Sequence, residues 1–148
     1  MNMNENSNFK IVHINELPSM FNREVKIDEE MLKKCTLGYL VVLQYQKGNE
    51  TIGLHVSIRY MTPDEKVLMQ EGATFVVNIE CWEEMSHEKK ALRESSVIKL
   101  LVEYGLSFVS GMIYRRVSGT VMNNIFVPYM DSSVIMENVV IEEVGQKK

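Results

Sequence analysis

The side chains most often used in catalysis are sparse in this chain, and their spacing matches no common catalytic or metal-binding pattern. The three histidines, His13, His55 and His87, lie in separate segments, and no two of them have the spacing of zinc ligands. The chain has no CxxC, HExxH or EF-hand motif and no glycine-rich loop that could hold a phosphate. We therefore predict no catalytic, metal-binding or cofactor-binding residues. A small enzyme, with a site assembled from distant residues, is the least favoured hypothesis.

The remaining reactive side chains have simpler structural explanations. Cys81 alternates toward the inner side of a predicted strand, where a buried thiol packs as a small apolar group. The serine pairs at 95–96 and 132–133 stand where helices are expected to begin, so we interpret them as helix starts and not as nucleophiles. Arg115 and Arg116 fall in the last turn of a predicted helix, where cations complement the helix dipole.

An acidic cluster, formed by Glu80, Glu83 and Glu84, lies beside Trp82. A general acid needs a carboxyl group that is desolvated in a cleft, whereas charges at the end of a strand are usually solvated. The cluster therefore has two interpretations, a solvated strand end and a recognition patch for a basic partner surface.

The overall charge and composition restrict the classes of function. The formal net charge is −4 and the pI is about 5.4, which argues against a primary nucleic-acid binder because such proteins need a basic surface. The N-terminus, MNMNENSNFK, lacks the apolar stretch of a secretory signal, and no uninterrupted apolar run approaches the roughly 20 residues of a membrane span. Two cysteines in different segments fit a reducing compartment. We expect a cytoplasmic protein that does not insert into membranes.

Alternating apolar residues predict an antiparallel sheet in the first half of the chain. The clearest strand is 51–60, where apolar side chains occupy every second position from Ile52 to Tyr60. Similar patterns predict strands over 9–17, 37–46 and about 73–82, and a crossover over 18–35 with a short helical turn near 28–34. The fold class is therefore α+β: a four-stranded antiparallel sheet with a crossover after the first strand.

One long helix and a short C-terminal helix are expected to pack on this sheet. The period becomes helical from about residue 93 to 118, and the apolar arc of this helix covers more than half of its circumference. A helix that packs on one sheet needs only a single apolar stripe, so we expect a partner subunit on a second side. Gly105 and Gly111 each lower helix propensity by about 1 kcal/mol relative to alanine, which is tolerable where they allow close backbone approach. The predicted interface residues are Leu101, Gly105, Phe108 and Met112.

Capping signals set the boundaries of the second half. The long helix is predicted to end at 118–120, where Gly119 suits a left-handed position, and Asp131 can cap a short helix near 132–138. These boundaries predict a flexible N-terminus at 1–8, a single domain at 9–142 and a charged tail at 143–148. Eleven methionines fill gaps in a core or an interface, or else form a surface that accepts many apolar ligands.

The segment after the long helix, RVSGTVMNNIFVPYMDSSVIM, resembles the passage between the two helices of the SecB family of cytoplasmic export chaperones and their SecB-like relatives. The strands FKIVHI, GLHVSIRY and FVVNIECWEE and the long helix follow in the same order as in that family. The resemblance extends over 9–142 in layout and is specific over about 104–136. The residues that align are Gly119, Thr120, Asn124, Phe126 and Pro128.

The resemblance implies an ATP-independent holdase, assembled as a dimer or tetramer. It would bind unfolded or partly folded polypeptides in apolar grooves between the crossover, the sheet and the helices. A translocase ATPase is a further partner if the chain serves export. The alternative is a dedicated partner-binding module of the same fold, for example a chaperone that serves a toxin–antitoxin pair. The groove candidates are Phe21, Val25 and Ile27 in the crossover and Met122, Phe126 and Tyr129 after the long helix.

Overall fold

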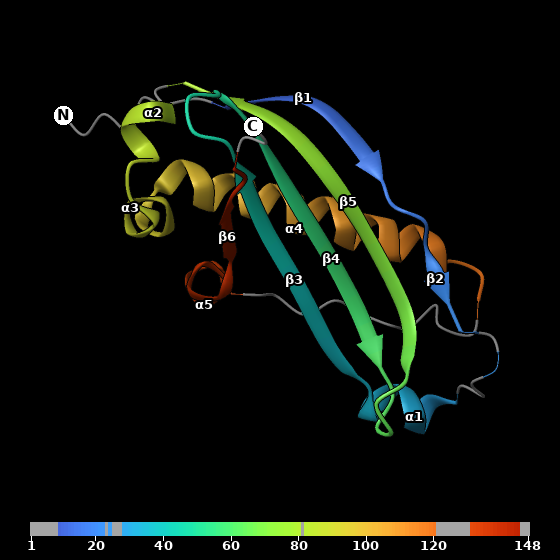
Figure 1. Cartoon of the computed structure of the whole chain (residues 1–148). Helices are drawn as coiled ribbons and strands as arrows, with labels where there is room; N and C mark the ends of the chain where they lie inside the picture. Colours follow the sequence, from blue (N-terminus) through green and yellow to red (C-terminus); the bar gives the residue numbers. More distant parts are fainter. Residues whose placement is uncertain (1–8, 23, 25–27, 81, 121–130, 146–148) are drawn as a thin grey trace.

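A mixed sheet of six strands and one long helix form the framework of the chain (Figure 1). The computed structural model describes residues 9–22, 24, 28–80, 82–120 and 131–145. The elements are β1 (Phe9–Glu16), β2 (Met20–Phe21), α1 (Glu29–Lys34), β3 (Thr36–Tyr45), β4 (Thr51–Met61), β5 (Val67–Ile79), α2 (Trp82–Met85), α3 (Lys89–Glu94), α4 (Ser96–Val117), α5 (Ser132–Asn138) and β6 (Val140–Glu143).

The four long strands are antiparallel neighbours in the order β1–β5–β4–β3. The connection from β1 to β3 contains α1, as the crossover prediction required, and also the short strand β2, which pairs with β5. At the other edge, β6 pairs with β3 in parallel. The predicted α+β class and the long helix packed on the sheet are confirmed. The predicted count of four strands is too low, because β2 and β6 are too short to show a period.

The alternation predicted over 51–60 is confirmed in β4, which lies in the middle of the strand order. Ile52, Leu54, Val56 and Ile58 are buried on the face that α4 covers. The next strand is longer than predicted, because β5 begins at Val67 and not near residue 73. A tight turn makes this possible: the backbone N–H of Thr62 donates to the carbonyl oxygen of Lys66 at 2.8 Å.

The long helix α4 crosses behind the sheet, and its main contacts with the sheet are made to β4 and β5 (Figure 1). Its C-terminal end is the predicted one, but it begins at Ser96 and not near residue 93, because α3 ends at Glu94. The hydroxyl of Ser95 accepts a hydrogen bond from the N–H of Ile98 at the start, and Gly119 has a φ of 77° just after the end. Helix α4 is long and apolar enough to cross a membrane by length and mean hydropathy, but half of its most apolar window is buried inside the chain. Helices that form the core of a sheet protein share this property.

Gly105 allows α4 to approach the sheet closely. A Cβ atom at this position would lie 2.9 Å from Cγ2 of Val56 and 3.2 Å from Cδ2 of Leu54. The prediction that this glycine permits close packing is confirmed, but the neighbour is the sheet of the same chain.

The C-terminal segment forms a short strand that was not predicted. Asp131 caps α5 by accepting a hydrogen bond from the N–H of Ser133, as predicted. The chain then continues directly into β6, where Ile141 is buried and the N–H of Val144 donates to the carbonyl oxygen of Tyr45 at 2.7 Å. Glu143, which was assigned to the charged tail, is therefore the last residue of β6.

Candidate functional site

One exposed side of α4 carries a stripe of uncharged residues, at whose edge the ring of Tyr104 also packs edge-to-face against Phe75 of β5, with centroids 6.1 Å apart. Leu100, Tyr104 and Tyr114 are 57%, 43% and 44% exposed, and the exposed residues between them, Ser107 and Gly111, are small. We call these five residues the outer stripe. Their separations of four, three, four and three positions are those of one face of a helix that packs against another helix. Large exposed side chains at this spacing are typical of an interaction surface.

The predicted interface residues require a correction. Leu101, Gly105 and Met112 are buried beneath the sheet of the same chain, so a second subunit cannot reach them. Phe108 is partly buried, and its ring packs edge-to-face against Phe75 with centroids 5.5 Å apart. The sequence pattern could not choose between two apolar faces of one helix. The contact between Gly105 and Val56 shows which face meets the sheet.

Most of the predicted groove residues lie outside the described part of the chain: Val25, Ile27, Met122, Phe126 and Tyr129. Phe21 is described and lies in β2, half-buried, opposite Met69. Strand register extends this pair across the sheet, because Met69 is opposite Tyr60 and Tyr60 is opposite Leu37. We call these four residues the cross-strand row. The two central residues, Met69 and Tyr60, are buried, and the two at the ends, Phe21 and Leu37, are half-buried.

The phenol of Tyr60 in this row has a strongly shifted pKa. Burial, followed by the neighbouring Tyr114 and Cys35, raises the pKa of Tyr60 to about 12. Tyr60 therefore lies near the end of the outer stripe and near the residue that follows α1. The cross-strand row and the outer stripe meet at this end of α4.

This shift predicts a loss of stability in alkali. A tyrosine whose pKa is raised by folding contributes stability that is complete below the pKa of the unfolded chain, about 10, and is lost as the pH rises through about 12. We expect the midpoint of urea unfolding to fall over this range, and Tyr60→Phe to reduce the fall. Absorbance at 295 nm is expected to show the late ionisation of Tyr60, which Tyr60→Phe removes. Identical alkaline profiles for the two proteins would contradict this placement.

An ion pair between β5 and the last turn of α4 was not predicted. The side chain of Glu71 is 1% exposed, and its Oε1 accepts a hydrogen bond from Nε of Arg116 at 3.0 Å. The second oxygen, Oε2, is buried and has no hydrogen-bond partner among the described residues. The neighbouring Arg115 pairs with Glu16 at the surface. Glu71 was missed because the strand was predicted to begin near residue 73, and Glu71 lies before that point. It is the one charged residue of β5, and its side chain is buried.

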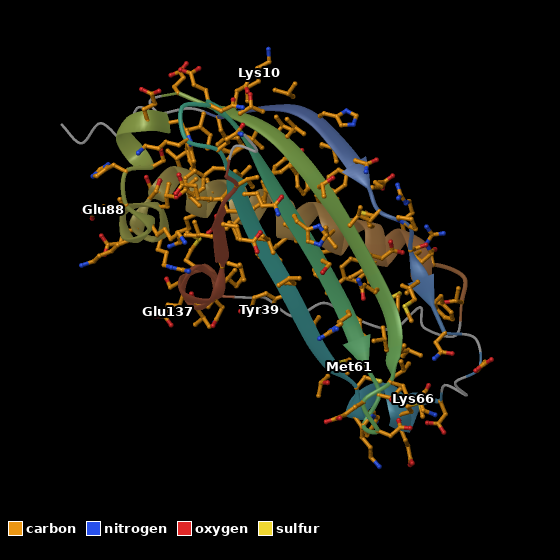
Figure 2. The ribbon with its side chains drawn as sticks, in the orientation of Figure 1. Lys10, Tyr39, Met61, Lys66, Glu88 and Glu137 are labelled. Atoms are coloured by element: carbon orange, nitrogen blue, oxygen red, sulfur yellow. The ribbon has the colours of Figure 1, made fainter. Side chains whose placement is uncertain are left out.

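The predicted acidic patch is divided by the structure. Glu80 and Glu83 are exposed at the end of β5 and in α2, while the side chain of Glu84 lies outside the described part. Trp82 is buried and packs edge-to-face on Tyr45, with ring centroids 5.5 Å apart. This end of the sheet also carries α3 and α5, which Glu88 and Glu137 mark in Figure 2, and Lys66 marks the opposite end. Trp82 therefore belongs to the core, whereas Glu80 and Glu83 lie at the surface.

The structure brings no three His, Cys, Asp or Glu side chains of its described residues close enough to hold a metal ion. The sequence was also compared with protein-family models and with curated proteins, and neither comparison gave a match.

Proposed function

We propose that this chain is a SecB-like, ATP-independent chaperone that holds unfolded polypeptides and acts as an oligomer in the cytoplasm. The observation that carries the proposal is a helix with two apolar faces behind a four-strand antiparallel arrangement. One face packs on the sheet through Leu101, Gly105 and Met112. The other face, the outer stripe, keeps three large apolar side chains exposed in the described chain.

The strand order supports the SecB-like part of the proposal. The resemblance implies a four-stranded antiparallel sheet with a crossover after the first strand. The order β1–β5–β4–β3, with β2 and α1 in the crossover, agrees with this layout. The short helix α5 follows the long helix, as the resemblance also implies. Strand β6 is an addition to that layout.

A second copy of the chain is the occupant that the outer stripe fits best. The small residues Ser107 and Gly111 lie at its centre, where two helices can approach closely, and the larger residues lie toward its ends. The five residues themselves are uncharged, and Glu103, one helical turn before Ser107, is a charged residue that a second copy would meet at the edge of the stripe. The stripe runs from Leu100 to Tyr114, which is about 21 Å along α4.

This interface is tested by introducing charge into the stripe. We expect Tyr104→Glu to lower the oligomer mass in light scattering, because burying a carboxylate between two helices is unfavourable. Val134→Glu is the matched control, since Val134 is an exposed apolar residue of another helix, α5. An unchanged mass for Tyr104→Glu would contradict the interface. A substitution at Met112 is unsuitable because its side chain is buried in the subunit.

Client binding is expected to use apolar burial together with main-chain pairing. Apolar contact contributes about 25 cal/mol per Å² without requiring a particular sequence. Strand β6 pairs only with residues 42–45 of β3, so residues 36–41 have an edge that no strand of the described chain covers. An extended polypeptide can add to such an edge. The negative net charge would steer basic clients toward the protein.

The binding step is tested with a client that cannot fold. Reduced and carboxymethylated lysozyme would be mixed with the chain in the absence of ATP, and the mass of the complex would be measured by light scattering after size exclusion. We expect a complex that contains one oligomer and the client. The proposal fails if no complex forms with this client or with a second, unrelated unfolded protein. Binding of only one client would favour the dedicated module.

A further inference from the structure

A cavity of about 420 Å³ lies between the β3–β4 turn, α2 and the end of β6. Cavities of this size can enclose a side chain together with its neighbouring backbone. Three segments that are far apart in the sequence build this one, and none of its residues belongs to the outer stripe or the cross-strand row. The lining residues are Tyr45, Lys47, Gly48, Glu83, Ser86, His87 and Glu143.

The position of Glu143 in this cavity is fixed by strand pairing. Glu143 lies opposite Tyr45 in the parallel ladder of β3 and β6, so both side chains leave the same face of the sheet. The hydrogen bond from the N–H of Val144 to the carbonyl oxygen of Tyr45, at 2.7 Å, holds the end of β6 in this register. The pKa of the Tyr45 phenol is raised by burial and then by the Glu143 carboxylate, so the two groups lie near each other.

The charges in the cavity are unbalanced. Glu83 comes from α2 and Glu143 from β6, and neither carboxylate forms an ion pair with a described residue. One cation, Lys47, lies at the same cavity, on an exposed turn from which its long side chain can move into solvent. Glu83, Glu143 and His87 do not come close enough together to form a metal site. A compact ligand with a single positive charge on an extended stem fits this arrangement better than an anion.

The buried aromatic pair gives the cavity a rigid floor. Tyr45 lines it, and Trp82 packs edge-to-face against Tyr45 from within the core at an interplanar angle of 70°. Tyr45, at the wall of the cavity, can contact the apolar stem of a lysine or arginine side chain whose head group reaches the acids. Ser86 adds a hydroxyl group to the wall, which can accept a hydrogen bond from such a head group.

We infer that this cavity binds the side chain of a lysine or arginine residue from an extended polypeptide, with Glu83 and Glu143 as the residues that recognise its charge. We call it the basic side-chain pocket. The inference rests on the proposed function, because it names the chemistry of the polypeptides that the chain would hold. It also replaces the predicted patch of Glu80, Glu83 and Glu84 with a pocket in which Glu143, from β6, is Glu83's partner.

The pocket is tested with acetyl-arginine amide as the probe and acetyl-citrulline amide as its neutral counterpart. Trp82 is the single tryptophan, so its fluorescence reports on the floor of the pocket, and the backbone amide signals of Gly48 and Ser86 provide a second measurement by NMR. We expect the arginine probe to shift these signals and the citrulline probe to bind at least about tenfold more weakly, since a charge-assisted hydrogen bond is lost.

Three variants assign the recognition to particular residues. Glu143→Gln and Glu83→Gln are each expected to weaken binding of the arginine probe about tenfold. Lys47→Met is expected to strengthen it about twofold to fivefold, because a competing cation is removed. Glu142→Gln is the matched control, because the adjacent Glu142 points to the other face of β6 and accepts a hydrogen bond from Gln44 at 3.0 Å.

The titrations and the client-binding experiment together separate failure of the pocket from failure of the proposed function. Equal binding of the two probes, equal effects of Glu142→Gln and Glu143→Gln, or no shift of any reporter signal would overturn the pocket. If the unfolded client still binds in these cases, the proposed function stands without the pocket. If the arginine probe binds as expected and no unfolded client does, the pocket stands and the proposed function fails.

Discussion

Replacing Arg116 with alanine is expected to lower the free energy of unfolding by about 2–4 kcal/mol, because it leaves a buried carboxylate without its partner. Glu71 is 1% exposed and accepts a hydrogen bond from Arg116 at 3.0 Å, while its other oxygen has no partner among the described residues. Loss of one member of a fully buried ion pair lowers the free energy of unfolding even more. The loss is smaller here because the Arg116 side chain is 51% exposed, so water can partly replace it.

The adjacent arginine is the matched control. Arg115 forms an ion pair with Glu16 at 2.7 Å, but both side chains are exposed, so Arg115→Ala is expected to change stability by less than about 1 kcal/mol. Glu71→Gln removes the buried charge, and in this background Arg116→Ala is expected to lose most of its effect. Urea unfolding of the four variants measures these differences. Equal losses for the two arginine substitutions would contradict the account of Glu71.

Two glycines of α4 are expected to respond in opposite ways to the same substitution. Gly105→Leu is expected to destabilise the chain by at least about 3 kcal/mol, because its Cβ would lie 2.9 Å from a methyl group of the buried Val56, and the remaining side-chain atoms have no free space. A Cβ atom added at Gly111 would meet no neighbouring heavy atom within 4 Å. Gly111→Leu is therefore expected to stabilise the isolated subunit by up to about 1 kcal/mol, through helix propensity.

The same pair of variants separates the subunit from the oligomer. Gly111 belongs to the outer stripe, so a leucine there would hold two α4 helices apart and is expected to lower the oligomer mass although the subunit is more stable. Thermal unfolding and light scattering on one sample measure both quantities. A Gly105→Leu protein as stable as the unsubstituted chain would contradict the close packing of α4 on β4. A Gly111→Leu protein of unchanged mass would count against the outer stripe as the interface.

Local periodicity was sufficient to predict the main elements of the fold. The alternation over 51–60 corresponds to β4, and the helical period over 93–118 corresponds to α4 with α3 before it. Ser95 explains the difference at the start of this helix: its N–H is bonded to the carbonyl oxygen of Leu92, while its hydroxyl caps α4, so the chain bends there. The capping roles of Asp131 and Gly119 were also predicted, because caps depend on adjacent residues.

The features that local patterns missed depend on contacts between distant segments. Strand β6 has four residues and is held by β3, about 100 positions earlier, so its own sequence shows no period. The apolar arc of α4 includes both the buried and the exposed faces, and only the contact with Val56 identifies the buried one. Glu71 and Arg116, like Glu83 and Glu143, come together through the sheet. The residues of these distant contacts could therefore not be read from local patterns.

Suppression of aggregation in the absence of ATP tests the central proposal most directly. Several unrelated proteins would be diluted from denaturant into buffer with increasing amounts of the chain, and light scattering would be followed over time. The proposal predicts that scattering falls for all of them at comparable ratios of oligomer to client, and that Tyr104→Glu weakens the effect if the oligomer is the active form. Unchanged scattering for every client, with a folded chain, would contradict the proposal.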